Sequence, residues 1–257
     1  MTQGWGSLRR WARSQVVIAL AGIFFATLSA HSQSDPAALM PDCAPMDQQA
    51  PLAGHPSTSA LGSARGSKAG ISATGTVIQE IRGTSFPELV HVDLRVRTFQ
   101  SQSDYFRTRF SSSRFLFLMR MRYYVEVNPA LFQGHVPAAG VCAVLAHELA
   151  HVVSLSQGNR FRRFGLVRLL SKGYTARFER RTDLEAIHRG YGDGLKSYRA
   201  WVYTHIPPAK LPEKLRNYFS PEEIAAIQIR LQAQPELFAY WSKHVPANLG
   251  EIQRARK

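Results

Sequence analysis

The order of apolar and polar residues along the chain changes near residue 76. Residues 33–75 are rich in Ser, Ala, Gly and Pro and poor in large apolar side chains. Such a stretch cannot bury enough apolar surface to offset the entropy that is lost when it becomes ordered. We therefore expect a flexible arm over residues 33–75 and a folded domain over residues 76–257.

Two segments of that domain alternate apolar and polar residues with the period of two that is typical of half-buried strands. In residues 90–97, valines and Leu94 alternate with polar side chains. In residues 115–127, Phe117, Tyr123 and their alternate neighbours are apolar, and Asn128-Pro129 ends the run. The pattern predicts a small antiparallel sheet.

The rest of the domain shows helical patterns. Residues 138–155 are apolar nearly all round, which predicts a buried helix, and Pro137 suits its first turn. Further helices are expected at residues 175–188 before Gly190, at residues 194–204, and after the capping sequence Ser220-Pro221-Glu222-Glu223. A small sheet followed by helices predicts an α+β fold.

The first 32 residues have the layout of a secretory signal peptide. Three arginines precede an apolar run from Val16 to Leu28, and small residues follow it. The run is shorter than the about 20 residues of a spanning helix, although an uncleaved N-terminal anchor is the alternative. We therefore expect export, to the periplasm.

Export changes how the charge is interpreted. The chain has 32 basic and 18 acidic residues, a net charge of +14, and removal of residues 1–32 takes away three arginines and no acid, which leaves +11. In a cytosolic protein this surplus would suggest a nucleic-acid partner. In an exported protein it points to anionic envelope surfaces or acidic partners, or to a basic solvated surface without a partner, and we expect no nucleic acid.

A basic, apolar stretch from Arg160 to Lys172 suggests one such contact. It mixes arginines with Phe and Leu in an amphipathic way. One hypothesis is contact with an anionic membrane surface. The alternative is a helix that packs over the active site with its arginines in solvent.

The two cysteines, Cys43 and Cys142, are too few for a disulfide framework. Export would place them in a compartment that permits disulfides. A bond between them would fix the arm to the predicted buried helix, and a free, buried Cys142 is the alternative.

The buried helix carries the segment His147-Glu148-Leu149-Ala150-His151. Helix positions i and i+4 share a face, about 6 Å apart at their β-carbons, so both imidazoles can reach one zinc ion. Glu148 stands beside such a metal, where it can take a proton from water and pass it to a leaving amine. Two satisfied core histidines are the alternative, but burying these three side chains without a metal is costly.

A later helix offers acids for the third protein ligand that zinc needs. Glu179 and Asp183 are four residues apart and share a face, whereas Glu185 points about 120° away from Glu179. We expect Glu179 to bind Zn²⁺ and Asp183 to accept the N–H of a ligating histidine. Asp183 as a direct ligand is the main alternative, Glu185 is the next, and a mixed-charge surface helix is the explanation without a metal.

His147-Glu148-Leu149-Ala150-His151 followed by Glu179-x-x-x-Asp183 resembles the gluzincin zinc metallopeptidases, and most closely the CAAX prenyl endopeptidase family and its soluble periplasmic relatives. The resemblance covers roughly residues 123–190. It implies a zincin-like domain, Glu179 as third zinc ligand, and an edge strand that holds the substrate peptide. The region 182–195 also resembles a group of uncharacterised exported bacterial proteins.

This sequence departs from the family pattern in two ways. Thr182 stands where a small residue is usual before the Asp, and the membrane spans of the integral members are absent. Candidates for stabilising the oxyanion are also present, and their spacing singles out none: Tyr174, His188, Arg189, Tyr191 and His205.

We therefore predict an exported zinc metallopeptidase that hydrolyses peptide bonds in a protein or peptide substrate. One alternative is a catalytically silent zinc- or protein-binding module of the cell envelope. The intact Glu148 argues against that alternative, because a pure binding site needs no general base. A second alternative is a cell-wall-directed amidase, but no aromatic cluster in the sequence marks the glycan-binding groove that it would need.

Overall fold

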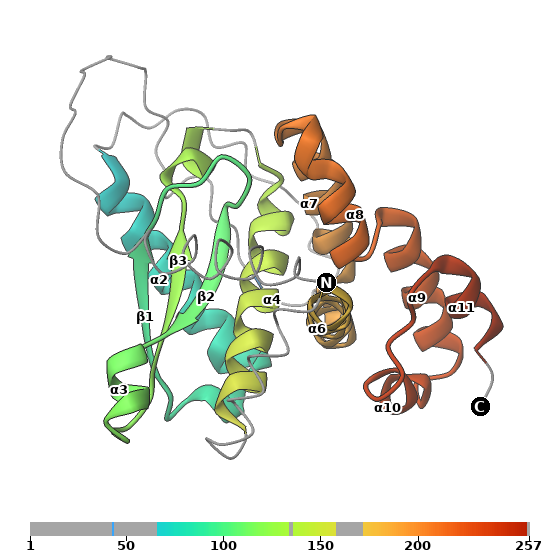
Figure 1. Ribbon diagram of the computed structural model, residues 1–257, viewed down its shortest axis with the longest axis horizontal. Helices are drawn as coiled ribbons and strands as arrows, with labels where there is room; N and C mark the ends of the chain where they lie inside the picture. Colours follow the sequence, from blue (N-terminus) through green and yellow to red (C-terminus); the bar gives the residue numbers. More distant parts are fainter. Residues whose placement is uncertain (1–42, 44–65, 134–135, 158–171, 256–257) are drawn as a thin grey trace, which may run out of the picture. The chain divides into compact units, whose positions relative to one another are not determined.

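The computed structural model describes residue 43 and residues 66–133, 136–157 and 172–255 (Figure 1). All of them belong to the unit Gln33–Lys257. Three predictions lie outside the described residues: the signal peptide, the arm as far as residue 65 apart from Cys43, and the basic stretch 160–171.

The described residues form helices and one sheet, which confirms the α+β fold class. The strands are β1 (Asp93–Thr98), β2 (Phe106–Phe110) and β3 (Arg122–Val127). The α-helices are α2 (Gly66–Ser85), α3 (Ser112–Leu116), α4 (Ala138–Ser156), α6 (Lys172–Ala186), α7 (Gly192–His205), α8 (Leu211–Asn217), α9 (Pro221–Ala233), α10 (Leu237–Trp241) and α11 (Leu249–Arg254). Shorter helical turns are η3 (Pro87–Leu89), η4 (Pro129–Gln133), the π-type turn η6 (Ile187–Tyr191) and η7 (Pro208–Lys210).

Helix α4 is the centre of the core, as its apolar sequence predicted. Every residue from Gly140 to Val153 is buried, and the helix packs against α2, α6, α7 and strand β2. Among the described residues it is the one helix long and apolar enough to cross a membrane by length and composition, but 78% of that window is buried inside the fold. The helix is therefore apolar because it is enclosed by protein on all sides.

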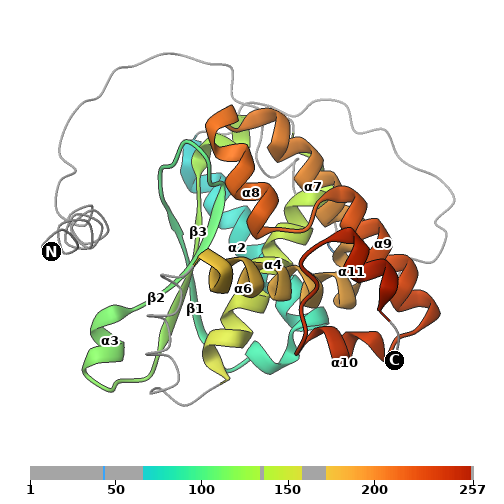
Figure 2. The same ribbon diagram turned by 45° about the vertical axis from the view of Figure 1, so that its right-hand side comes forward.

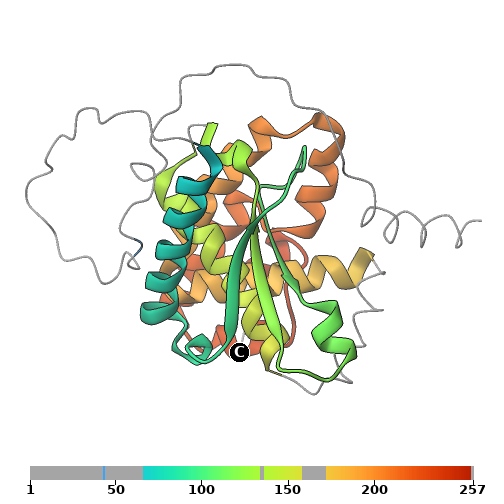
Figure 3. The same cartoon turned by 90° about the vertical axis from the view of Figure 1, so that its left-hand side faces the viewer.

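The sheet has the order β1-β3-β2 and lies in front of α4 in Figure 3. Strands β2 and β3 are antiparallel, but β1 and β3 are parallel, with Asp93 opposite Arg122. The predicted all-antiparallel sheet is therefore wrong. The physical reason is a third strand, β2, which reverses the chain between β1 and β3; its alternation of Phe106, Thr108 and Phe110 with arginines is a strand pattern.

The predicted strand 115–127 is also shorter than expected, because residues 112–116 form helix α3. The Ser111 side chain accepts a hydrogen bond from the Arg114 N–H and caps this helix. Its end is a Schellman turn, in which the Met119 N–H bonds to the Arg114 carbonyl and the Leu118 N–H to that of Phe115.

The arm is shorter than predicted at its C-terminal end, since α2 begins at Gly66. Val77, Ile78 and Ile81 from this helix are buried in the core, and Thr74 is fully buried. Packing of this apolar face stabilises a helix through residues whose own helix propensity is weak.

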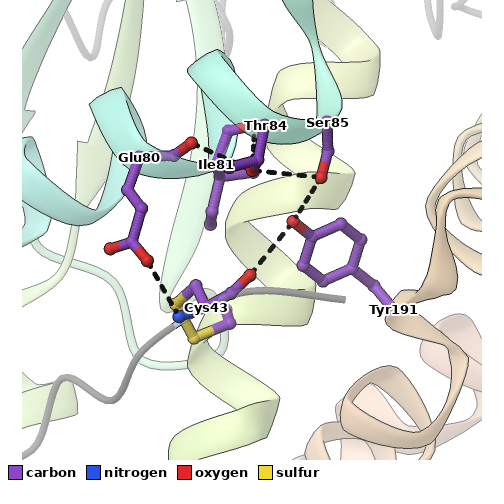
Figure 4. Close-up of a disulfide and its surroundings, with 7 residues drawn as sticks. Cys43, Glu80, Ile81, Thr84, Ser85 and Tyr191 are labelled. Carbon is purple, nitrogen blue, oxygen red and sulfur yellow. Dashed lines mark hydrogen bonds between the residues drawn. A yellow bond between two sulfur atoms is a disulfide. The ribbon is translucent and has the colours of Figure 1, made fainter. Parts of the chain in front are cut away.

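A disulfide links Cys43 to Cys142 on α4 (Figure 4). The Cys43 N–H donates to Glu80 on α2, and its carbonyl accepts a hydrogen bond from the Tyr191 hydroxyl. The bond closes a sequence separation of 99 residues, for which loop-closure entropy predicts a stabilisation of about 4–5 kcal/mol. Residue 43 is thus fixed to the helix that carries the two histidines.

Helix ends in the C-terminal half follow the predicted signals. Gly190 has a φ of 89° and breaks the helical path between α6 and α7, a conformation that glycine adopts without a steric penalty. Ser220 and Glu223 form the capping box of α9. Helix α6 packs against α4 (Figure 2).

Candidate metal centre

Two histidines on α4 form one wall of the candidate metal centre. His147 and His151 are one helical turn apart, both are buried, and their ring centroids lie 4.7 Å apart. Burial of both rings means that their nitrogen atoms need polar partners within the site.

Helix α6 supplies the carboxylate. Glu179 Oε2 lies 3.1 Å from His151 Nε2 and 3.4 Å from His147 Nε2. Three atoms that bind one zinc ion tetrahedrally at about 2.0–2.1 Å lie about 3.3 Å from one another. The two distances to Glu179 match this spacing, and all three ligand atoms lie within 4.8 Å of one another, so the group His147, His151 and Glu179 could hold a metal ion.

The second nitrogen of each ring has a polar partner that sets the tautomer. His147 Nδ1 lies 2.7 Å from Asp183 Oδ1, and an ionised carboxylate only accepts, so Nδ1 carries the proton. His151 Nδ1 lies 3.2 Å from the Thr182 hydroxyl, which donates its own proton to the Phe178 carbonyl. When both imidazoles are neutral with the proton on Nδ1, each Nε2 has a lone pair that faces Glu179, as metal ligation requires.

Asp183 is held behind His147 by two further contacts. It accepts from the Arg199 guanidinium at 2.7 Å and from the Phe219 N–H at 3.1 Å. Burial raises the pKa of Asp183, but Arg199 and then His147 outweigh burial and hold this pKa below its usual range. Both oxygens of Asp183 are occupied, so it is placed to orient His147.

The charges of the site perturb its titration when no metal is bound. Burial lowers the pKa of His147, but Asp183, Glu179 and Glu148 outweigh it and raise this pKa to about 9. Burial raises the pKa of Glu179, but His151 and His147 outweigh it and hold this pKa well below its usual range. The surrounding carboxylates therefore favour positive charge at this site, and a proton on His147 supplies it when no metal is bound.

The net charge of the cluster fits a divalent cation. Glu148, Glu179 and Asp183 carry three negative charges and Arg199 carries one positive charge, and all four contribute to this cluster. With neutral imidazoles the surplus is −2. A buried surplus of this kind is costly unless a cation neutralises it.

Glu148 stands next to the ligand group but outside it. Its side chain is buried, and its Oε2 accepts a hydrogen bond from the Thr108 hydroxyl at 2.7 Å. Thr108 lies on β2, so the strand fixes the direction of this carboxylate. The arrangement leaves Glu148 on the wall of a cavity, where it can exchange protons with a bound molecule.

A cavity of about 490 Å³ opens onto the site. It is bordered by His151, Glu148 and Glu179 on one side and by the whole of β2, from Phe106 to Phe110, on the other. Tyr218 also lines it and lies with its ring 5.9 Å from that of His147. The volume is sufficient for several residues of an extended peptide.

The other candidates from the sequence lie elsewhere. Glu185 pairs with Arg189, so it is not a ligand of this group. None of the oxyanion candidates borders the cavity. Their contacts are of other kinds: Tyr174 stacks on Phe178, His188 on Phe238 and His205 on Trp201, while Arg189 pairs with Glu88 and Tyr191 bonds to Ser85 and Cys43.

Three residues of the site were not predicted from the sequence: Thr108, Arg199 and Tyr218. Each acts through a contact that is distant in sequence, such as the separation of 40 residues between Thr108 and Glu148. The strand pattern around Thr108 could have been recognised, but its contact with Glu148 depends on the fold. Nothing in the local sequence marks Arg199 or Tyr218.

No protein-family model, no curated protein and no solved structure matches this chain.

Proposed function

We propose that this protein is an exported zinc-dependent endopeptidase. The observation that carries the proposal is the group of two histidine nitrogens and one carboxylate oxygen, all within 4.8 Å of one another, with a separate carboxylate, Glu148, on the wall of the adjoining cavity. Two His nitrogens with one Glu oxygen form a ligand set typical of catalytic zinc, which keeps a fourth position for water.

Zinc would act as a Lewis acid that lowers the pKa of a water molecule toward neutral pH. Glu148 would accept the proton of that water and deliver it to the leaving amine. The Thr108 hydroxyl holds the Glu148 carboxylate in one direction through the bond at 2.7 Å. This bond leaves the other carboxylate oxygen available for the proton.

Strand β2 offers a place for the substrate backbone. Among the described residues β2 pairs only with β3, so its other edge has unpaired N–H and C=O groups, and the strand borders the cavity. An extended peptide could pair with this edge and pass the metal centre. This geometry favours a polypeptide substrate over a small amide.

Tyr218 is our candidate for stabilising the oxyanion. Burial, and then Glu179, raise the pKa of Tyr218 well above 10, so its phenol is a hydrogen-bond donor at neutral pH. The cation of Arg199 lies 4.1 Å from the ring centre and holds the ring from one side. A donor on the cavity wall suits a developing negative charge on a substrate carbonyl.

Replacement of Glu148 tests the proposal. In Glu148→Gln the cleavage of a peptide library should fall by about 10²–10⁴-fold, the usual contribution of a general base, while bound zinc is retained. The experiment uses zinc-loaded residues 33–257, the unit that contains all described elements. Stoichiometric zinc with no cleavage by the parent protein would instead support the catalytically silent zinc-binding module.

A further inference from the structure

The turn between α3 and β3 exposes a run of large apolar side chains. Leu116, Phe117 and Leu118 are 73%, 72% and 72% exposed, and the next residue, Met119, is 49% exposed. We call residues 116–119 the apolar tip. It lies at the end of the sheet that points away from α7 and α9 (Figure 2). A contiguous apolar patch of this kind is uncommon on a soluble protein and marks a site of interaction.

Arginines flank the apolar tip on both sides. Residues 111–122 contain Arg114, Arg120 and Arg122 and no Asp or Glu. Arg122 pairs with Asp93, whereas among the described residues no carboxylate forms an ion pair with Arg114 or Arg120. Their guanidinium groups donate to main-chain carbonyls of Arg120 and His91, which holds them beside the turn. The apolar tip therefore stands within a positive surface.

Leu118 occupies a position that suits glycine better. Its φ is 55°, and it is the one non-glycine residue with positive φ among the described residues. It is the left-handed residue of the Schellman turn after α3, where glycine has no steric penalty. A leucine here makes the turn less stable than a glycine would and exposes an apolar side chain, a combination that points to a contact outside the folded chain.

We propose that the apolar tip and its arginines dock the protein on an anionic lipid bilayer. The side chains of Leu116, Phe117 and Leu118 would enter the boundary between headgroups and acyl chains, and Arg114 and Arg120 would contact anionic headgroups. A protein partner fits less well, because stable protein interfaces bury about 1,200–2,000 Å² in matched surfaces. A projecting turn of four residues offers far less, whereas a fluid bilayer needs no matched surface.

Docking in this way would bring the cavity close to the membrane. Phe110 and Ser112 border the cavity, and the Phe110 ring packs against Phe115 at the base of the turn, with centroids 5.7 Å apart. If the proposed peptidase function holds, its substrates would be polypeptide segments at the membrane surface. This consequence rests on the proposed function, but docking itself does not, so Glu148→Gln should bind vesicles as well as the parent protein.

Vesicle co-sedimentation of residues 33–257 tests the proposal. The vesicles are phosphatidylcholine alone or with about 30% phosphatidylglycerol, a typical anionic surface. The double variant Leu116→Ser with Phe117→Ser should bind the anionic vesicles at least about 10-fold more weakly, because it loses two inserted side chains. Arg114→Gln and Arg120→Gln should each weaken binding about 5-fold. The matched control is Ile229→Ser on α9, which removes a side chain that is 66% exposed and should change nothing.

Leu118→Gly is the sharpest variant, because it separates docking from folding. We expect its melting temperature to equal or exceed that of the parent and its vesicle binding to fall several-fold. Absence of parent binding to anionic vesicles, or binding that Leu116→Ser with Phe117→Ser leaves intact, would overturn the proposal. Equal binding to neutral vesicles would overturn the role of the arginines. A dimer in sedimentation velocity that Leu118→Gly dissociates, without vesicle binding, would assign the apolar tip to protein contact instead.

Discussion

Helix α6 contributes to two buried groups of charged side chains, and they differ in electrical balance. Arg180 pairs with Glu223 at 3.1 Å and also donates to main-chain carbonyls of α8 and of Pro246. That group has one charge of each sign, and every guanidinium nitrogen of Arg180 donates a hydrogen bond. The second group, which we call the metal-centre group, consists of the two histidines with Glu148, Glu179, Asp183 and Arg199. It keeps a surplus of two negative charges when its imidazoles are neutral.

The difference separates a structural ion pair from a binding site. Both groups are buried, and both bring together residues that are distant in sequence. In the metal-centre group two imidazole nitrogens face one carboxylate oxygen at 3.1–3.4 Å, and with neutral imidazoles a surplus of negative charge is left for a cation to neutralise. Burial of charge alone therefore does not indicate a site, whereas burial of unbalanced charge around three possible metal ligands favours one.

The largest effect is expected from Asp183→Asn. The lowered pKa of Asp183 shows that the folded protein favours its charge, and its loss leaves the buried Arg199 without a partner, at a cost of about 3–5 kcal/mol. Denaturant unfolding in the presence of a chelator measures this cost. Glu185→Gln on the same helix is the matched control, because its pair with Arg189 is partly exposed, and it should cost at most about 1 kcal/mol.

The next effect is a pH dependence that belongs to the metal-centre group alone. The pKa of His147 is raised to about 9 in the folded protein, against 6.5 in the unfolded chain. Protonated His147 therefore stabilises the metal-free protein fully at pH values below 6.5. This contribution, roughly 3 kcal/mol, should be lost as the pH rises from 6.5 through 9. Unfolding measured across that range gives the slope, and Asp183→Asn should flatten it. A slope that Asp183→Asn leaves unchanged would assign the titration to another group.

A smaller effect, on metal affinity, is expected from Thr182→Val. The Thr182 hydroxyl accepts a hydrogen bond from His151 Nδ1, so the substitution removes the partner that keeps the proton of this ring on Nδ1. Loss of such an outer partner typically weakens metal binding by about 10–100-fold, which calorimetric titration with zinc would detect. Thr182→Ser keeps the hydroxyl and should retain the affinity. Equal affinity for Thr182→Val would mean that the ring is oriented by packing against Phe178 alone.

The smallest effect is expected from the double change Arg180→Met with Glu223→Gln. It removes the balanced pair, and Gln retains the capping box that Glu223 forms with Ser220. Replacement of a buried ion pair is often neutral, so we expect stability within about 1 kcal/mol of the parent. Zinc affinity should be unchanged. If it falls as far as in Thr182→Val, the two groups are not independent.

The sequence predicted those parts of the site that follow from helical spacing. The i, i+4 relation placed His147 with His151 and Glu179 with Asp183 on shared faces, and the structure brings the two faces together. The sequence left Glu185 open as a further candidate ligand, and the structure pairs Glu185 with Arg189 outside the ligand group. Periodicity likewise predicted α4 almost to the residue, because burial on all sides requires an apolar sequence.

The remainder depends on contacts that no local pattern contains. Residues 115–117 continue the apolar alternation of β3, but the cap by Ser111 turns them into helix α3 and the apolar tip. Arg199 is an ordinary helix residue until folding places it against Asp183. The parallel pairing of β1 with β3 depends on the position of β2 in the chain.

Zinc content tests the central claim most directly. Purified protein of residues 33–257 is dialysed first against zinc and then against metal-free buffer. Its zinc content is measured by elemental mass spectrometry, together with that of Glu148→Gln and Glu179→Ala. We predict about one zinc per chain for the parent and for Glu148→Gln, as expected of a three-ligand site, and far less for Glu179→Ala. A parent protein that retains no zinc, or Glu179→Ala that retains as much as the parent, would contradict the account.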